Sequence, residues 1–344
     1  MSAREGASLP CTSGFSCPAC AAPLHTRASS IACTSCNRVF SSLAGVPDLR
    51  LSYPDPYVSW EEDRERALAL ADRAGSLDLV GLLGEHWRAS GYPETLAERF
   101  LGLELATGKR AAAYLDAIER ERGRPLDAED ALLEVGCGTA VVAATAAARV
   151  GRAVGTDVSM RWMVLAKKRL SETGAEAVEL ACCSAEQLPF PPSTFDVVVA
   201  VDVIEHVAHQ PQFVAACHAV LRPGGMLFLA TPNRLSLGLE PHVRLWGVGF
   251  LPRRLAPRYV RALSGRPYDH VRLLSAPGLR RLLTSAGFSV KIVPPEIATS
   301  TEQLYRGVEL RLVRAYNRAR RFALARRSLL AVGPFFHVFA TKRG

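Results

Sequence analysis

Five apolar runs, separated by longer segments of mixed composition, constrain the fold of this chain more than any other feature. The runs are ALLEV, RAVGTDV, AVEL, FDVVVAVDV and MLFLAT, all between residues 131 and 233. Short apolar runs of this kind are typical of strands covered on both faces, and the segments between them are long enough for crossover helices. We therefore predict an α/β fold in which helices cover both faces of a largely parallel sheet.

A glycine-rich turn follows the first of these runs, in the segment LLEVGCGTA. Gly136 and Gly138 lie where the strand passes into a helix, and glycine allows the backbone to approach a ligand closely. Dinucleotide enzymes share such a turn, so by itself it is weak evidence. The next strand ends at Asp157, about twenty residues on, where a carboxylate can accept hydrogen bonds from both hydroxyls of a ribose.

Three further motifs follow in order: SAEQLPF, FDVVVAVDVIEHV and LRPGGMLFLATPNR. Together with the glycine-rich turn and Asp157, they resemble the class I S-adenosylmethionine-dependent methyltransferases, over roughly residues 130 to 295. The resemblance implies a Rossmann-like fold with a seven-stranded mixed sheet, whose last strand, FFHVFATK, is antiparallel. It also implies an enzyme that uses S-adenosylmethionine as its methyl donor.

The resemblance also implies contacts with the cofactor, position by position. They are Glu134 near the ammonium group, Gly136, Cys137 and Gly138 beneath the methionine part, Asp157 on the ribose, Val158 and Met160 beside the adenine, and Ser184, Ala185 and Glu186 along its edge. Two positions depart from the family. Ala140 replaces a third glycine and adds a methyl group, and Ser184 replaces an aspartate that meets the adenine amino group.

Three polar residues follow the fourth strand at the edge where ligands bind in such sheets: Asp202, Glu205 and His206. A hydroxyl acceptor needs a base, and His206 is the favoured one because its ordinary pKa lies near working pH. The segment resembles the E-H-V segment of ubiquinone-pathway O-methyltransferases. In some such relatives a divalent cation binds in this region, so a metal held by Glu205 and His206 is one alternative. Packing or capping of the following helix is another.

The acceptor is predicted from one absence and one insertion. The chain has no Asn-Pro-Pro-Tyr or Asp-Pro-Pro-Tyr segment, which disfavours N-methylation of nucleobases or glutamine. Residues 233–272 are too long for a simple connection, and we predict that they form an acceptor-site insertion. Its candidate lining residues are His242, Trp246, Phe250, Tyr259, Tyr268 and His270. They favour O-methylation of a small or lipid-like metabolite.

Four cysteines near the start form two Cys-x-x-Cys pairs, Cys17 with Cys20 and Cys33 with Cys36. Each pair offers two sulfurs to one ion, and zinc prefers four thiolates in a tetrahedron. We predict a structural zinc ribbon over residues 1–50 that braces a helical linker or cap at 51–125, before a methyltransferase domain at 126–344. The ribbon resembles modules found beside methyltransferase domains, including tRNA-methyltransferase activators. Buried or coincidental cysteines are the alternative.

Two stretches hold the excess positive charge, +9 over the chain. Residues 241–272 carry seven arginines against one acidic residue, and residues 302–327 carry eight against two. A helix over 302–327 would place an apolar stripe between Arg311, Arg314, Arg318 and Arg321, a layout that suits anionic lipid. The stripe is Leu304, Tyr305, Val308, Leu312, Tyr316, Ala319, Phe322 and Ala323. The alternative is that this stripe packs on the sheet.

The cellular setting follows from what the chain lacks. It has no signal-peptide pattern and no run of 18 apolar residues, so we expect a cytoplasmic protein, with peripheral contact at the inner membrane surface as a further prediction. One rival function is an rRNA or tRNA methyltransferase whose zinc ribbon contacts RNA, since basic patches suit phosphate. Another is a non-catalytic interaction module on a cofactor fold, against which Asp157 and His206 argue. The oligomeric state is not predicted.

Overall fold

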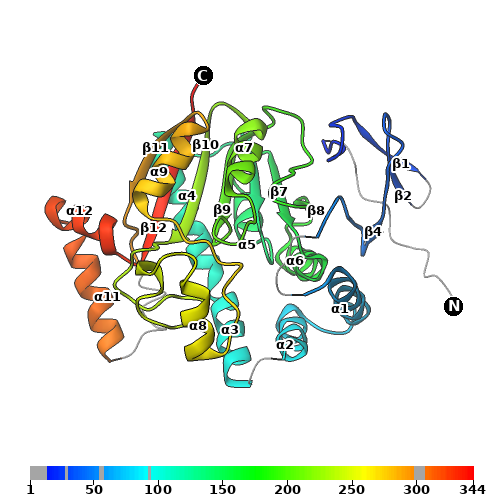
Figure 1. Ribbon diagram of the computed structural model, residues 1–344. Helices are drawn as coiled ribbons and strands as arrows, with labels where there is room; N and C mark the ends of the chain where they lie inside the picture. Colours follow the sequence, from blue (N-terminus) through cyan, green and yellow to red (C-terminus); the bar gives the residue numbers. More distant parts are fainter. Residues whose placement is uncertain (1–13, 28–29, 54–57, 92–93, 298–306) are drawn as a thin grey trace.

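A computed structural model describes residues 14–27, 30–53, 58–91, 94–297 and 307–344. Its centre is a seven-stranded sheet in the order β11-β12-β10-β9-β6-β7-β8 (Figure 1). The strands are β6 (Ala131–Val135), β7 (Arg152–Asp157), β8 (Glu179–Cys182), β9 (Phe195–Val201), β10 (Leu221–Pro232), β11 (Phe288–Val293) and β12 (Phe335–Lys342). β6 to β10 pair in parallel, and β12 is antiparallel to both β10 and β11. The predicted mixed sheet, with its antiparallel last strand, is confirmed.

Helices cover both faces of this sheet because alternate strand residues point to opposite sides (Figure 1). One core cluster joins Val197, Val199 and Phe228 to the helices α4 (Thr107–Arg122), α5 (Val141–Ala146) and α6 (Met160–Thr173). A second cluster joins Val198 and Leu227 to α7 (Gln210–Val220) and α9 (Ala276–Ser285).

The N-terminal cysteines lie on a small antiparallel sheet of β1 (Leu24–Arg27), β2 (Ser30–Cys33) and β3 (Val39–Phe40). A short pair, β4 (Ser42–Leu43) and β5 (Val46–Pro47), leads to α1 (Trp60–Arg73), α2 (Leu79–Ala89) and α3 (Glu94–Leu105). The ribbon therefore contacts α1 of the predicted helical cap, but it also packs against the open edge of the large sheet at β8 (Figure 1).

The insertion after β10 folds around its own small core and carries η1 (Val248–Phe250) and α8 (Ala256–Ser264). The helix predicted over 302–327 is instead two helices, α11 (Val308–Ala319) and α12 (Ala323–Val332). Each helix has its own anchor: Tyr316 Oη, in the second half of α11, donates to Pro295 O (2.8 Å), and Asn233 Nδ2 donates to Ala331 O (3.1 Å) at the end of α12. Leu304 and Tyr305 lie outside the described residues.

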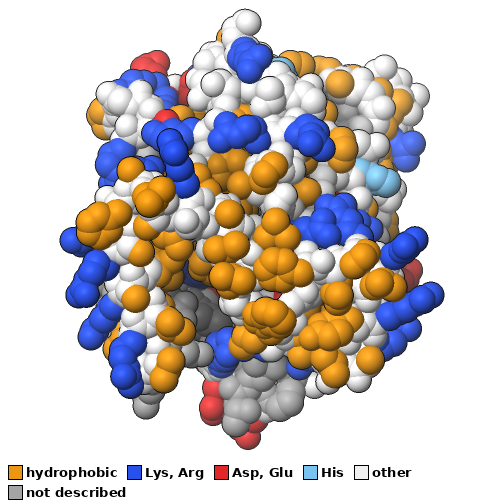
Figure 2. Space-filling model, turned by 60° about the vertical axis from the view of Figure 1, so that its left-hand side comes forward, with side chains coloured by type: hydrophobic (Ala, Val, Ile, Leu, Met, Phe, Trp, Pro, Cys, Tyr) orange, Lys and Arg blue, Asp and Glu red, His pale blue; other side chains and the backbone are white. Residues whose placement is uncertain are grey.

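The face formed by the insertion and these two helices is rich in apolar and basic side chains (Figure 2). Trp246 and Phe250 of the insertion are exposed, as are Leu312 of α11 and Phe322 and Leu324 beside α12. Lys and Arg side chains lie around this apolar area, and few acidic side chains are visible among the described residues in this view (Figure 2).

Candidate active site

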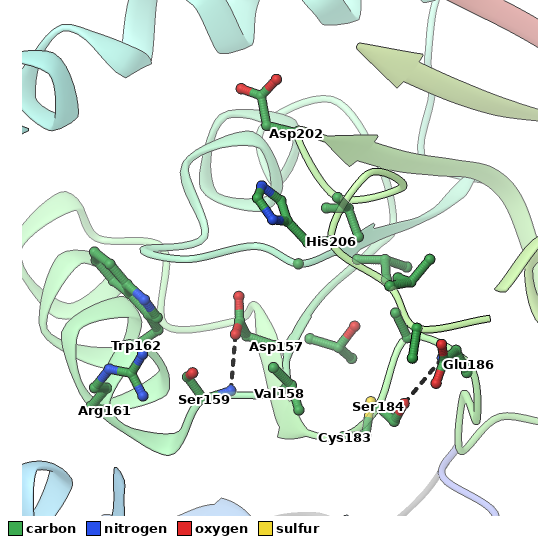
Figure 3. Close-up of a pocket in the computed structure, with 17 residues that line it drawn as sticks. Asp157, Val158, Ser159, Arg161, Trp162, Cys183, Ser184, Glu186, Asp202 and His206 are labelled. Carbon is green, nitrogen blue, oxygen red and sulfur yellow. Dashed lines mark hydrogen bonds between the residues drawn. The ribbon is translucent and has the colours of Figure 1, made fainter. Parts of the chain in front are cut away.

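A cavity of about 250 Å³ opens at the carboxyl ends of β6, β7, β8 and β9 (Figure 3). This is the edge at which ligands bind in parallel α/β sheets. Its wall comes from four loops that each follow a strand, and it includes most of the motifs singled out from the sequence. The predicted residues on this wall are Gly136, Asp157, Val158, Ser184, Ala185, Glu186, Asp202 and His206.

The glycine-rich turn has the geometry that its composition indicates. Gly136 has a φ of +64°, and a Cβ placed there would lie 2.4 Å from Val203 Cγ2, so no larger residue fits. Gly138 N donates to Asp157 Oδ2 (3.0 Å), and Ser159 N donates to Asp157 Oδ1 (2.9 Å; Figure 3). These two hydrogen bonds fix the Asp157 carboxylate at the cavity wall.

Four of the predicted cofactor contacts are not on this wall: Glu134, Cys137, Gly138 and Met160. Glu134 is buried and accepts hydrogen bonds from Ala143 N (2.7 Å) and Val142 N (3.3 Å). It therefore caps the start of α5 rather than facing the cavity. Burial raises the pKa of Glu134 to about 8. Cys137 and Met160 are buried.

Other wall residues were missed from the sequence, among them Ser159, Arg161, Trp162 and Cys183. Ser159, Arg161 and Trp162 lie within five residues of Asp157, at the start of α6. Their closeness to Asp157 in the sequence was the signal that could have predicted them. The ring of Trp162 packs against His86 of α2 at 4.5 Å between centroids. The helical cap therefore supports this wall of the cavity from behind.

Asp202, Glu205 and His206 lie together just beyond β9, as predicted. Asp202 lies on the cavity wall. Its backbone φ is +54°, a value that is uncommon for a residue other than glycine. Glu205 is fully buried, and its Oε2 accepts from Thr231 Oγ1 (3.0 Å). Burial, followed by the charge of Asp202, raises the pKa of Glu205 to about 8.

The insertion contributes one residue to this cluster, His242. Its Nε2 lies 3.1 Å from His206 Nε2, and its Nδ1 lies 2.5 Å from Glu240 Oε1. Burial disfavours the charged form of His242, but the hydrogen bond and charge of Glu240 outweigh it and raise the pKa of His242. Glu240 also accepts from the backbone N–H groups of His242 (2.9 Å) and Val243 (2.8 Å), which holds its carboxylate in place.

The other candidate lining residues of the insertion lie away from this cavity. Trp246 and Phe250 are exposed, Tyr268 is buried in the small core of the insertion, and Tyr259 Oη donates to Trp246 O (2.9 Å). A second cavity of about 150 Å³ shares Asp202 with the first and is formed by α4, β10 and β12 instead. Its wall includes Arg110, Tyr114, Thr231, Phe335, Phe336 and His337.

The four N-terminal cysteines converge as predicted, with all four sulfurs within 4.8 Å of one another. Cys17 Sγ lies 3.7 Å from Cys36 Sγ, and Cys20 Sγ lies 3.4 Å from Cys33 Sγ. The backbone N–H groups of Ser35 and Cys36 donate to Cys33 Sγ (3.4 Å each), and these bonds lower the pKa of Cys33. Four converging sulfurs with such backbone donors fit a tetrahedral metal site.

Comparisons with known proteins identify a methyltransferase domain in this chain. Residues 133–229 match the family described as Methyltransferase domain. A ubiquinone biosynthesis O-methyltransferase of Rhizobium etli is 34% identical over 170 residues, which cover 49% of this chain and 67% of the relative. A similar enzyme of Rhizobium rhizogenes is 29% identical over 62% of this chain and 85% of its own length.

Other relatives are matched over less of their length. A probable S-adenosylmethionine-dependent methyltransferase of Mycolicibacterium smegmatis is 34% identical, and the chain spans 52% of it. Among solved structures, a phosphoethanolamine N-methyltransferase of Haemonchus contortus has a TM-score of 0.45 at 18% identity, covering 67% of this chain and 52% of the other. A methyltransferase of Thermotoga maritima has a TM-score of 0.43 at 20% identity, covering 72% and 98%.

Proposed function

The chain belongs to the class I S-adenosylmethionine-dependent methyltransferases, and we propose that it methylates a hydroxyl group of a small or lipid-like acceptor. The observation that carries this proposal is the chain of Glu240, His242 and His206, which ends at the cavity wall beside Asp202. A hydroxyl must lose its proton as its oxygen is methylated, and this chain offers a base for that proton.

The hydrogen bonds assign the tautomers of the two histidines. When both histidines are neutral, Glu240 accepts from His242 Nδ1–H, so His242 Nε2 carries a lone pair and accepts from His206 Nε2–H. In this tautomer His206 Nδ1 is unprotonated, and it is the nitrogen that we propose takes up the acceptor proton. When His206 takes up that proton, the negative charge of Glu240 stabilises the resulting cation through His242.

S-adenosylmethionine supplies an electrophilic methyl group, and the residues on the first cavity wall suit its adenosine part. Asp157, oriented by Gly138 and Ser159, presents a carboxylate for the ribose hydroxyls. Most of the catalysis then comes from holding the acceptor oxygen in line with the methyl group.

The second cavity supports an aromatic or partly apolar acceptor. Phe335 and Phe336 supply apolar rings, whereas Arg110 and Tyr114 supply a cation and a phenol. Burial raises the pKa of Tyr114 to about 12, so its hydroxyl stays protonated and can donate a hydrogen bond. Asp202 lies between this cavity and the first one, as expected for a residue near the transferred methyl group.

The test is methyl transfer from labelled S-adenosylmethionine into three fractions of a bacterial extract: lipids, water-soluble metabolites and total RNA. We expect label in the lipid or metabolite fraction, released by reagents that cleave methyl ethers, and little label with the His206→Ala variant. Label confined to RNA would contradict the proposal and favour the RNA methyltransferase alternative. Absence of transfer into all three fractions, despite cofactor binding, would favour the non-catalytic alternative.

A second chemistry, in which a divalent cation at the same cluster activates the acceptor hydroxyl, is favoured by the arrangement of three side chains. One ligand atom each from Glu205, His206 and His242 lies within 4.8 Å of the others. Glu205 Oε1 is buried and has no hydrogen-bond partner among the described residues. Glu240 on His242 Nδ1 is the outer carboxylate that metal-bound histidines commonly have. These three residues would hold a divalent cation, which would lower the pKa of a bound hydroxyl.

Chelation separates the two chemistries. If the histidines act alone, turnover survives dialysis against EDTA. If a cation acts, turnover falls at least tenfold and returns with added Mg²⁺, Mn²⁺ or Zn²⁺. His242→Gln is the matched variant, because it would lower metal affinity while leaving His206 at the cavity wall.

We also propose that Cys17, Cys20, Cys33 and Cys36 bind one structural zinc ion. The converging sulfurs support this, and such a small module gains most of its stability from metal binding. Metal analysis of gently purified protein is expected to give one zinc per chain. Less than about half an equivalent would contradict the proposal.

Peripheral contact with an anionic membrane is the remaining proposal. No helix among the described residues is both long and apolar enough to cross a bilayer. The face in Figure 2, however, combines apolar with basic side chains. In the insertion, in α11 and next to α12, the side chains of Trp246, Phe250, Leu312 and Phe322 are exposed. Exposed aromatic and apolar residues among arginines suit the headgroup region of anionic lipid. Tyr316 of the predicted stripe does not contribute, because it is half-buried against Pro295.

Co-sedimentation with vesicles tests this proposal. Binding should require phosphatidylglycerol, weaken as salt is added, and fall when Arg311, Arg314, Arg318 and Arg321 are changed to Gln. The control removes four exposed charges from the helical cap instead, by changing Arg64, Arg88, Arg99 and Lys109 to Gln. Equal losses in both variants, or no binding at low salt, would contradict the membrane proposal and favour a water-soluble acceptor.

A further inference from the structure

The N-terminal ribbon is built onto the edge of the large sheet. Leu49 N donates to Cys182 O (2.8 Å), and Asp48 pairs in parallel with Cys182, which extends the sheet beyond β8. The Phe15 ring lies 5.3 Å from that of Phe190, and the ribbon residues Cys17, Ile31 and Cys33 belong to the same core cluster as the sheet. The next residue after β8, Cys183, is on the wall of the cofactor cavity.

Arg50, two residues beyond Asp48, connects this edge to the cofactor cavity. Its side chain is buried and donates to Asp48 Oδ2 (2.6 Å), Asp63 Oδ2 (2.8 Å) and Val158 O (2.9 Å). The guanidinium carbon also lies 5.0 Å from the ring centres of both Tyr53 and Trp60. Burial disfavours its charge, but the hydrogen bond and charge of Asp48 outweigh burial and raise the pKa of Arg50.

Asp63 of α1 performs a related task at the start of α6. It is fully buried, and it accepts hydrogen bonds from Met160 N (2.9 Å), Arg161 N (3.3 Å) and Arg161 Nη1 (2.8 Å). A carboxylate at this position satisfies helix N–H groups and interacts favourably with the helix dipole. A residue from the helical cap, far away in the sequence, therefore caps the helix that follows the cofactor loop.

These contacts hold one particular part of the cavity. Val158, Ser159, Arg161 and Trp162 all lie on its wall, on the side of Asp157, where the adenosine part of the cofactor is placed by the proposed function. Arg50 holds the carbonyl of Val158 from outside, and Asp63 holds the backbone of Arg161. Without Arg50, the buried carboxylates of Asp48 and Asp63 would lose the positive charge of its guanidinium group. Leaving these carboxylates without that charge is costly enough to move the surrounding backbone.

From this arrangement we infer that Arg50 and Asp63 are positioning residues for the adenosine part of the cofactor, and that the metal-loaded ribbon tunes cofactor affinity through Arg50. The inference rests on the proposed zinc and cofactor sites. It assigns the ribbon a role in cofactor binding, beyond the bracing role expected from its small size.

The first test measures binding of S-adenosylhomocysteine by calorimetry to the full chain and to Arg50→Lys. Lysine keeps the positive charge but lacks the fork that reaches Asp48, Asp63 and Val158 together. We expect at least tenfold weaker binding. The matched control is Arg122→Lys, because Arg122 pairs with the buried Asp130 (2.6 Å) immediately before β6, away from the cavity wall. The Arg122→Lys variant should have lower thermal stability but unchanged affinity for S-adenosylhomocysteine.

Wild-type affinity in Arg50→Lys would overturn the inference, as would an equal loss of affinity in both lysine variants, which would indicate general destabilisation. Asp63→Asn adds a second check: it keeps the shape but not the charge, and a several-fold loss of affinity is expected. If the unmodified protein binds no S-adenosylhomocysteine at all, the cofactor assignment fails and this inference fails with it.

The second test addresses the ribbon. Cys36→Ser removes an exposed ligand without disturbing the buried core, and Ser35→Ala beside it is the control. We expect zinc loss, several-fold weaker binding, and faster amide hydrogen exchange over residues 158–163 only in Cys36→Ser. In a protein that already carries Arg50→Lys, Cys36→Ser should add little. Zinc loss with unchanged affinity would overturn the role of the ribbon, whereas a failed methyl-transfer assay would leave this binding result standing.

Discussion

The wall facing the cofactor and the cluster facing the acceptor lie in one site, but the chain builds them differently. The cofactor wall uses loops that follow successive strands, from Gly136 through Asp157 to Ser184. The acceptor cluster joins His206 to His242 of the insertion, and the second cavity draws on α4, before the methyltransferase domain, and on β12 near its end. The first wall therefore comes from loops at the ends of neighbouring strands, whereas the second joins segments that lie far apart in the sequence. Changes on the two sides should separate binding from chemistry.

The largest expected effect is on turnover, from His206→Ala. Removing the proposed base should lower kcat by about a hundredfold, the usual scale for general acid–base catalysis, without changing the Kd for S-adenosylmethionine. Single-turnover kinetics and calorimetry on the same preparation measure the two quantities. A normal kcat would assign His206 to a structural role, and a large change in Kd would mean that the two sides of the site are not separable.

Asp157→Ala should have the opposite pattern. Loss of the carboxylate is expected to weaken cofactor binding by about 2 kcal/mol, the scale of hydrogen bonds to a charged group, or roughly thirtyfold in Kd. At saturating cofactor, kcat should stay within a few-fold of wild type. Asp157→Asn is the control for shape, and unchanged calorimetric affinity in both variants would contradict the placement of the ribose.

Each side also contains a histidine with a lowered pKa. Burial lowers the pKa of His86, behind Trp162, to about 3, and that of His337, on the second cavity, to about 4. Both groups bind protons more readily in the unfolded chain, where the pKa is near 6.5, so stability is full above pH 6.5 and falls as the pH drops toward 4. Because of each histidine, the free energy of unfolding should fall by about 1 kcal/mol between pH 6.5 and pH 5.5.

Urea unfolding at several pH values measures that loss, with His86→Phe and His337→Phe as variants. Each variant should reduce the decrease in the free energy of unfolding at acid pH by the amount that its histidine contributes. If the pH dependence of the free energy of unfolding is unchanged in both variants, other groups cause the acid sensitivity. If only His337→Phe also alters the KM for the acceptor, the second cavity is confirmed as distinct from the cofactor wall.

The smallest expected effect is from Glu240→Gln. The amide carries no charge, so the pKa of His242, which Glu240 raises, should fall, and kcat should fall about threefold. The histidine ring signals in NMR titrations report the pKa directly. An unchanged pKa for His242 would mean that Glu240 does not reach its ring in solution.

The sequence by itself determined the parts of this protein that depend on neighbours in the chain. Apolar runs marked β6, β7, β9 and β10, and glycines at the end of β6 marked the turn, because strand burial and positive φ leave local signatures. The two Cys-x-x-Cys pairs predicted the sulfur cluster for the same reason, since each turn brings two sulfurs together. Asp157, Asp202 and His206 followed from their places at strand ends, which the topology brings to one edge.

Only the tertiary structure decided the remainder, because it depends on residues far apart in the chain. Glu134 turned away from the cavity to cap α5, where the first N–H groups of a helix need acceptors. The segment predicted as one helix over 302–327 contains two helices, α11 and α12, which are anchored to different loops. His242 met His206, and Arg50 met Asp63 and Val158, across separations that no local pattern records. Periodicity reports which face of an element is buried, but packing chooses the partner that it is buried against.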